Sequence, residues 1–151
     1  MLKKKTLDDV DLSGKKALVR VDYNVPLDSN GNITDDSRIR ATLPTINHIL
    51  DRDGSVIPMS HLGRPKGKRV PSMSLEPVAR RLTRLLKQEV DLLPDCVGEE
   101  VTKAVGELKP GGVLLLENLR FHPEERANDD QFSRLLVGLA DIYVDDAFVT
   151  A

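Results

Sequence analysis

The sequence has little of what several protein classes require. It contains one cysteine, Cys96, so no disulfide forms within the chain, and a reducing compartment, the cytoplasm, is expected. Aromatic residues make up 3% of the chain and tryptophan is absent, which disfavours base-stacking platforms for nucleic acids. No apolar run approaches the length that crosses a bilayer, so no membrane association is expected.

The composition that remains is that of a globular domain. Hydrophobic residues account for 40% of the 151 residues and charged residues for 30%, which is unlike a disordered segment. This length suits one domain, so we expect residues 1–151 to fold as a single unit. The formal net charge of −2 disfavours a general binder of nucleic acid or of acidic membranes.

Short apolar runs alternate with segments of helical periodicity along the chain. Because alternating strands and helices form parallel sheets, the pattern predicts an α/β fold. We expect a doubly wound, mainly parallel sheet of about five strands with helices on both faces, a Rossmann-like three-layer sandwich. The predicted strands are 17–22, 55–60, 89–93, 113–116 and 142–144, and the predicted helices lie within 34–50, 74–86, 97–108 and 128–139.

Two prolines and two hydroxyl residues refine this pattern. Pro44 interrupts the first helix, so we expect a kink there or a helix that begins nearby. Pro58 weakens the prediction of strand 55–60, because a central strand needs the N–H donor that proline lacks. Thr34 and Ser74 are the predicted caps of the first two helices.

Polar side chains follow several of the predicted strands. Ligands bind outside the carboxyl ends of strands in open α/β sheets, so these side chains are expected to meet at one edge. Arginine forks and histidines gathered there predict a cationic pocket for a small, multiply charged anion, with nearby acid and amide groups binding a ligand hydroxyl. The set comprises Asp22, Asn24, Arg38, His61, Arg64, Arg120 and His122.

Simpler interpretations remain open for each of these groups. Any single arginine could be a surface charge, and either histidine could be a satisfied polar group. The pair Asp145–Asp146 could hold a metal ion, although such pairs more often cap helices or form salt bridges. Cys96 has no histidine at motif spacing and is predicted to be a small buried hydrophobe. We therefore predict no metal ligand.

No nucleotide-binding motif is present. Residues 63–69 look like a phosphate-binding loop, but the glycine spacing is one residue short and Arg69 stands where Ser or Thr belongs. The dinucleotide pattern Gly-x-Gly-x-x-Gly is absent as well. The chain itself is expected to bind no cofactor.

Several longer motifs lie in order along nearly the whole chain, at residues 19–26, 33–39, 60–67 and 116–122, with shorter matches at 94–98 and 146–148. Together they resemble the motifs of the phosphoglycerate kinase family. That resemblance implies phosphoryl transfer between 1,3-bisphosphoglycerate and ADP, giving 3-phosphoglycerate and ATP in glycolysis, with magnesium. It also implies a second domain that holds the magnesium nucleotide and closes onto the first about a hinge.

The resemblance also assigns roles to individual residues. It implies that Arg38 is catalytic and stabilises the phosphoryl group in transfer, which needs positioning and electrostatics and no covalent intermediate. It implies that Asp22 and Asn24 contact the glycerate part of the substrate. The carboxylate and phosphate are then held by His61, Arg64 and Arg120.

Family chains are well over twice this length, so we expect only the substrate domain here, with weak phosphoglycerate binding and no turnover. Two alternatives are a non-catalytic anion-binding module and a fragment that self-associates through its cut end. The family usually has glycine where Val149 stands, and a positive φ there would strain valine.

Overall fold

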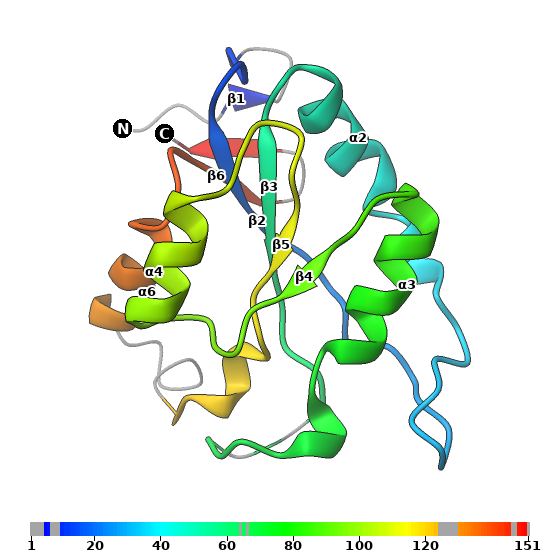
Figure 1. Cartoon of the computed structure of the whole chain (residues 1–151). Helices are drawn as coiled ribbons and strands as arrows, with labels where there is room; N and C mark the ends of the chain where they lie inside the picture. Colours follow the sequence, from blue (N-terminus) through cyan, green and yellow to red (C-terminus); the bar gives the residue numbers. More distant parts are fainter. Residues whose placement is uncertain are drawn as a thin grey trace.

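The computed structural model describes residues 5–6, 10–63, 65, 67–123, 130–145 and 148–150, with backbone alone at 5, 6, 130, 133 and 148–150. The five predicted strands are all present and run parallel, in the order β6-β2-β3-β5-β4 (Figure 1). Their bounds are β2 Lys16–Arg20, β3 Ser55–Met59, β4 Asp91–Leu92, β5 Leu114–Leu115 and β6 Ile142–Asp145. The predicted α/β fold with a mainly parallel sheet is confirmed.

Pro58 lies in the middle of β3 and interrupts the ladder to β5. The Val56 amide donates to the Gly112 carbonyl (3.0 Å), and the Leu116 amide donates to the Pro58 carbonyl (3.2 Å). Between these two bonds the parallel pattern asks for an amide donor at Pro58, which has none. The proline therefore removes one ladder bond on the β5 side and leaves the pairing of β3 with β2 continuous.

An antiparallel edge extends the sheet beyond the predicted strands. β7 (Phe148–Thr150) pairs with β6, and β1 (Lys5–Thr6) pairs with β7. Val149 lies opposite Val144 in this ladder. It therefore has the extended backbone that β-branched residues favour, and the strain of a positive φ does not arise.

Helices cover both faces of the sheet (Figure 1). Ala17 and Val19 of β2 pack with α2 and α3, whereas Leu18, between them, packs with α4 and α6. This alternation builds one core on each side, as expected for a strand buried on both faces. The helices are α2 Leu43–Asp51, α3 Glu76–Leu86, α4 Glu99–Gly106 and α6 Asp130–Val137.

Within the described ranges, no helix is both long and apolar enough to cross a membrane. Leu135 on α6 keeps 53% of its surface exposed, although it shares the apolar periodicity of buried Phe132 and Leu136. The sequence predicts Asn128 or Asp129 as the cap of this helix, and both lie outside the described residues.

The helix starts differ in part from prediction. Pro44 is the second residue of α2, so it begins a new helix, as one of the two expected outcomes. The prediction that Thr34 caps the first helix is wrong, because the short helix α1 (Ser37–Arg40) starts later. There the Asp35 carboxylate accepts a hydrogen bond from the Ser37 amide (2.9 Å). Ser74 does accept the Glu76 amide bond at the start of α3 (3.2 Å).

Candidate functional site

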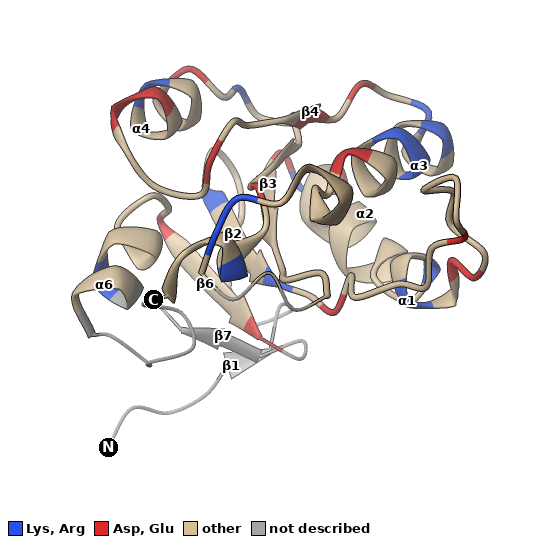
Figure 2. Cartoon of the chain, turned by 90° about the horizontal axis from the view of Figure 1, so that it is seen from below, with Lys and Arg blue, Asp and Glu red and all other residues tan. Residues whose placement is uncertain are grey.

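A cleft of about 520 Å³ opens where β2, β3 and β6 end. The chain leaves these strands at the lower edge of the sheet in Figure 1, and Figure 2 looks onto that edge. A second hollow of about 440 Å³ lies beside it, and Arg38 lines both. The polar and charged residues of the larger cleft are Arg20, Asp22, Arg38, Thr42, Thr45, Ser60, His61 and Asp145.

Arg38 is held by the loop that follows β2. Its Nη1 donates to the Asn24 carbonyl (2.7 Å) and to Asp22 Oδ1 (3.3 Å). Both contacts use Nη1, so within the described part of the chain the Nε and Nη2 donors of the fork are available for an anion. The side chains of Arg38 and Asp22 are 52% and 62% exposed, which leaves this group accessible from solvent.

Asn24 also connects this loop to the segment after β3. Its Oδ1 accepts a hydrogen bond from the Gly63 amide (2.8 Å). Gly63 has a φ of 64°, a conformation that suits glycine. The Tyr23 amide donates to Ser60 Oγ (2.9 Å), and that hydroxyl donates to the His61 carbonyl (3.0 Å). The two strand ends are thereby locked side by side, with His61 in the cleft wall.

The side chain of Tyr23, next to this connection in the sequence, is fully buried. Its hydroxyl shares a hydrogen bond with Thr42 Oγ1 (2.8 Å). Burial raises the pKa of Tyr23 well above its usual range, and the bond to Thr42 offsets only part of that rise. Thr42 in turn lines the cleft.

Arg120 stands on the short helix η3 (Leu119–Phe121) after β5 and is not among the residues that line the cleft. Its carbonyl accepts the Gly67 amide (3.2 Å), so η3 contacts the loop that follows β3. Arg64 lies in that loop, outside the described residues. The structure therefore brings together Asp22, Asn24, Arg38 and His61, and does not place Arg120 in the same cleft.

Two buried polar residues, Glu117 and Asn118, support this edge from inside. The Glu117 carboxylate, 3% exposed, accepts bonds from the Ser74 hydroxyl (2.7 Å) and the Leu75 and Asn118 amides (2.8 and 2.9 Å). Asn118 Nδ2 donates to the carbonyls of Leu62 (2.7 Å) and Met73 (2.9 Å). These bonds fix three segments against one another.

The charges that line the cleft differ from the predicted cationic pocket. Arg20 and Arg38 face two carboxylates, Asp22 and Asp145, so the described charged side chains balance. Arg20 and Asp145 lie opposite each other in the β2–β6 pairing. The sequence prediction placed Arg20 inside strand 17–22 and gave it no role. The structure makes it the last, exposed residue of β2, at the mouth of the cleft.

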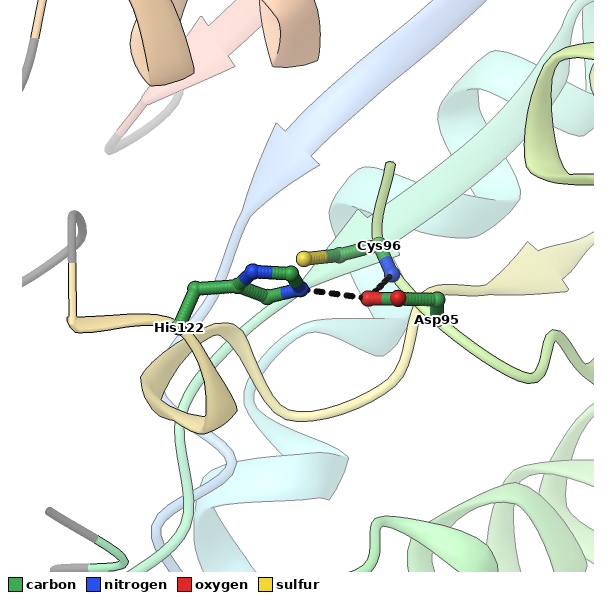
Figure 3. Close-up of side chains that lie close together, drawn as sticks. All are labelled: Asp95, Cys96 and His122. Carbon is green, nitrogen blue, oxygen red and sulfur yellow. Dashed lines mark hydrogen bonds and ion pairs between the residues drawn. The ribbon is translucent and has the colours of Figure 1, made fainter. Parts of the chain in front are cut away.

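His122 belongs to a separate cluster and is not among the residues that line the cleft. Its Nε2 lies 2.6 Å from Asp95 Oδ1, beside the buried thiol of Cys96 (Figure 3). Although burial opposes it, hydrogen bonds from His122 and the Cys96 amide lower the pKa of Asp95. Burial, followed by the nearby Asp95 carboxylate, raises the pKa of Cys96. The thiol is therefore neutral and buried, as predicted.

Comparison with known proteins decides the family. The family model described as phosphoglycerate kinase matches residues 7–151. The chain belongs to the phosphoglycerate kinase family. It is 61% identical to the phosphoglycerate kinase of Aquifex aeolicus and 58% identical to that of Chlorobium luteolum, each over 150 residues. Both alignments cover 99% of this chain and 38% of the relative, so the chain spans less than half of either.

Solved structures of the family agree with this assignment. The phosphoglycerate kinase of Coxiella burnetii superposes with a TM-score of 0.83 at 35% identity, over 95% of this chain and 35% of the other. That of Pyrococcus horikoshii superposes with a TM-score of 0.82 at 33% identity, over 94% and 36%. The resemblance inferred from the motifs is confirmed.

Proposed function

We propose that this chain is the substrate domain of a phosphoglycerate kinase and binds 3-phosphoglycerate or 1,3-bisphosphoglycerate at the lower sheet edge. The observation that carries the proposal is the position of Arg38. Its Nη1 is anchored by Asp22 and the Asn24 carbonyl, and the residue lines both hollows. Arginine forks bind carboxylate and phosphate oxygens in pairs.

The other residues of the site follow from this placement. His61 in the cleft wall donates to a carboxylate or phosphate oxygen, and Asp22 and Asn24 bind the glycerate hydroxyl. Arg64, from the loop after β3, and Arg120, from η3, supply the further positive charge that the balanced cleft lacks. Arg38 then faces the transferred phosphoryl group and stabilises its negative charge in the transition state.

Phosphoglycerate kinases use a magnesium nucleotide, and we assign its binding to the part of the family protein that this chain does not cover. The sequence has no phosphate-cradling glycine motif. Among the described residues, the one group of potential metal ligands contains a thiol and an imidazole, whereas magnesium prefers oxygen ligands. A cytoplasmic location belongs to the same proposal.

A ligand titration tests this function. We expect millimolar 3-phosphoglycerate to shift the amide signals of Asp22, Asn24, Arg38 and His61 in heteronuclear NMR spectra, while glycerol, which lacks the charges, leaves them in place. The absence of shifts near Arg38 would overturn the proposal. Shifts that persist in the Arg38→Ala variant with unchanged affinity would overturn the role of Arg38.

Turnover is a separate question. We expect no ATP-dependent phosphorylation of 3-phosphoglycerate by this chain alone, because the nucleotide site is assigned elsewhere. Activity that co-purifies with the chain and is lost in the Arg38→Ala variant would contradict this. A non-catalytic anion-binding module is the alternative: Arg38→Ala would then lower affinity, and adding the remaining part of a family protein would restore no activity.

A further inference from the structure

A second group of chemically versatile side chains lies apart from the cleft. Asp95 and Cys96 belong to the loop after β4, and His122 follows η3 after β5, so adjacent parallel strands bring them together. One carboxylate oxygen, the sulfur and one imidazole nitrogen all lie within 4.8 Å of one another. The three side chains point toward a common centre (Figure 3).

From this geometry we propose that Asp95, Cys96 and His122 form a binding site for a zinc-class divalent cation. Thiolate, imidazole and carboxylate are the three protein ligands that zinc accepts, and sites with three protein ligands keep a fourth position for water. The sulfur selects against magnesium and calcium, which prefer oxygen ligands alone.

The exposure of the three side chains lets a small ion reach the site. The Asp95 and His122 side chains are 42% and 26% exposed, so an ion enters between them, whereas Cys96 below them is fully buried. Burial of the sulfur argues against an alternative, a cysteine nucleophile with a His–Asp pair, because a substrate carbonyl could not reach it.

The ligands are held before any ion arrives. The Asp95 carbonyl accepts the Glu117 amide (3.3 Å), which ties the loop after β4 to the end of β5. The Cys96 amide donates to Asp95 Oδ1 (2.7 Å), and the His122 ring packs against Phe132 with centroids 5.2 Å apart. Neighbours that orient metal ligands in this way raise affinity.

Binding requires a small, balanced rearrangement. The Asp95 Oδ1 to His122 Nε2 contact of 2.6 Å opens so that both atoms face the ion. The S–H bond of Cys96 breaks, its proton goes to solvent, and the sulfur–metal bond forms, with no change in oxidation state. The ion then joins the loop after β4 to the end of η3.

Cobalt(II) alone is the probe, because it replaces zinc and reports sulfur coordination by absorption. We expect one equivalent to give a near-ultraviolet sulfur-to-cobalt charge-transfer band and visible bands of four-coordinate cobalt. Zinc should abolish both, and excess magnesium should not. Cys96→Ser should lose the charge-transfer band, and Asp95→Asn and His122→Asn should weaken binding by about tenfold or more. His48→Asn on α2 is the control and should bind like the wild type.

Two results would overturn the site. One is the absence of a charge-transfer band at saturating cobalt, and the other is a band that survives in Cys96→Ser with the folded spectrum intact. If Cys96→Ser does not fold, the His122→Asn variant provides the test. Unchanged cobalt affinity in that variant would also overturn the site. The cluster is separate from the cleft, so neither outcome bears on phosphoglycerate binding.

Discussion

Two acidic residues at the same edge of the sheet have opposite roles. Glu117 is 3% exposed and accepts three hydrogen bonds from Ser74, Leu75 and Asn118. Asp22 has a 62% exposed side chain, accepts the Asn24 amide bond and contacts Arg38 at 3.3 Å. A buried carboxylate with every partner fixed holds the fold, whereas an exposed one with a long contact can exchange partners with a ligand.

The neighbouring residues follow the same division. Asn118 is 1% exposed, and its side-chain amide donates hydrogen bonds to the carbonyls of Leu62 and Met73. Asn24 bonds Gly63 but stays partly exposed beside Arg38. The difference teaches that strand-end position alone does not identify a binding residue, and that accessible hydrogen-bonding capacity must be considered too.

The largest expected effect comes from removing the buried carboxylate. Glu117→Ala leaves the Ser74 hydroxyl and two amides without their acceptor in a dry environment. We expect a loss of about 3 kcal/mol in the free energy of unfolding, measured by urea denaturation. The exposed Glu89→Ala is the matched control and should stay within about 0.5 kcal/mol of wild type. Similar losses of unfolding free energy in the two variants would contradict the structural role of Glu117.

The next effect concerns binding. Arg38→Ala should weaken 3-phosphoglycerate binding by about 2 kcal/mol, roughly thirtyfold, because a charge-assisted contact is lost. Arg40→Ala is the control on the same short helix: its side chain is 60% exposed, against 52% for Arg38, and it contacts Asp36. NMR or calorimetric titration of both variants measures the difference, and an equal loss of affinity would show a general charge effect.

A smaller effect is expected at Tyr23, between the two regions. Tyr23→Phe removes the hydroxyl bond to Thr42 and should cost about 1 kcal/mol at neutral pH. Because the pKa of Tyr23 is raised in the folded state, its stabilising contribution is intact below the unfolded pKa of about 10 and falls as pH rises above it. The free energy of unfolding, measured in urea, should therefore fall less steeply with rising alkaline pH for the variant than for the wild type. Parallel curves would contradict this.

The smallest effect is expected at Asp22. Asp22→Asn should change the free energy of unfolding by less than about 0.5 kcal/mol, because exposed ion pairs contribute little. Urea denaturation beside Glu117→Ala gives the direct comparison of the two carboxylates. A loss near that of Glu117→Ala would mean that Asp22 stabilises the fold. Asp22 would then not belong with the exposed residues that can bind a ligand.

Much of the fold could be predicted because its signals are local. The apolar runs 113–116 and 17–19 reflect burial on both faces of a sheet, and Pro44 starts a helix because its missing N–H is harmless there. The antiparallel pairing of β1 with β7 joins residues that are far apart in the sequence, so no local pattern predicts it.

The candidate site was predictable only in part. Asp22, Asn24, Arg38 and His61 do meet, as strand-end positions indicated. His122 follows a strand end too, but β5 lies between β3 and β4, and His122 pairs with Asp95 on the outer loop. Strand order, which local sequence does not encode, decided that difference.

The sequence by itself determined the alternation of strands and helices, the arginine and histidine content of the sheet edge, and the family motifs. Tertiary structure alone decided which polar groups are buried and which are open, as for Glu117 and Asp22. It also placed Cys96 beside a histidine 26 positions away in the sequence. The physical reason is that burial and proximity depend on which strands become neighbours, and long-range packing sets that order.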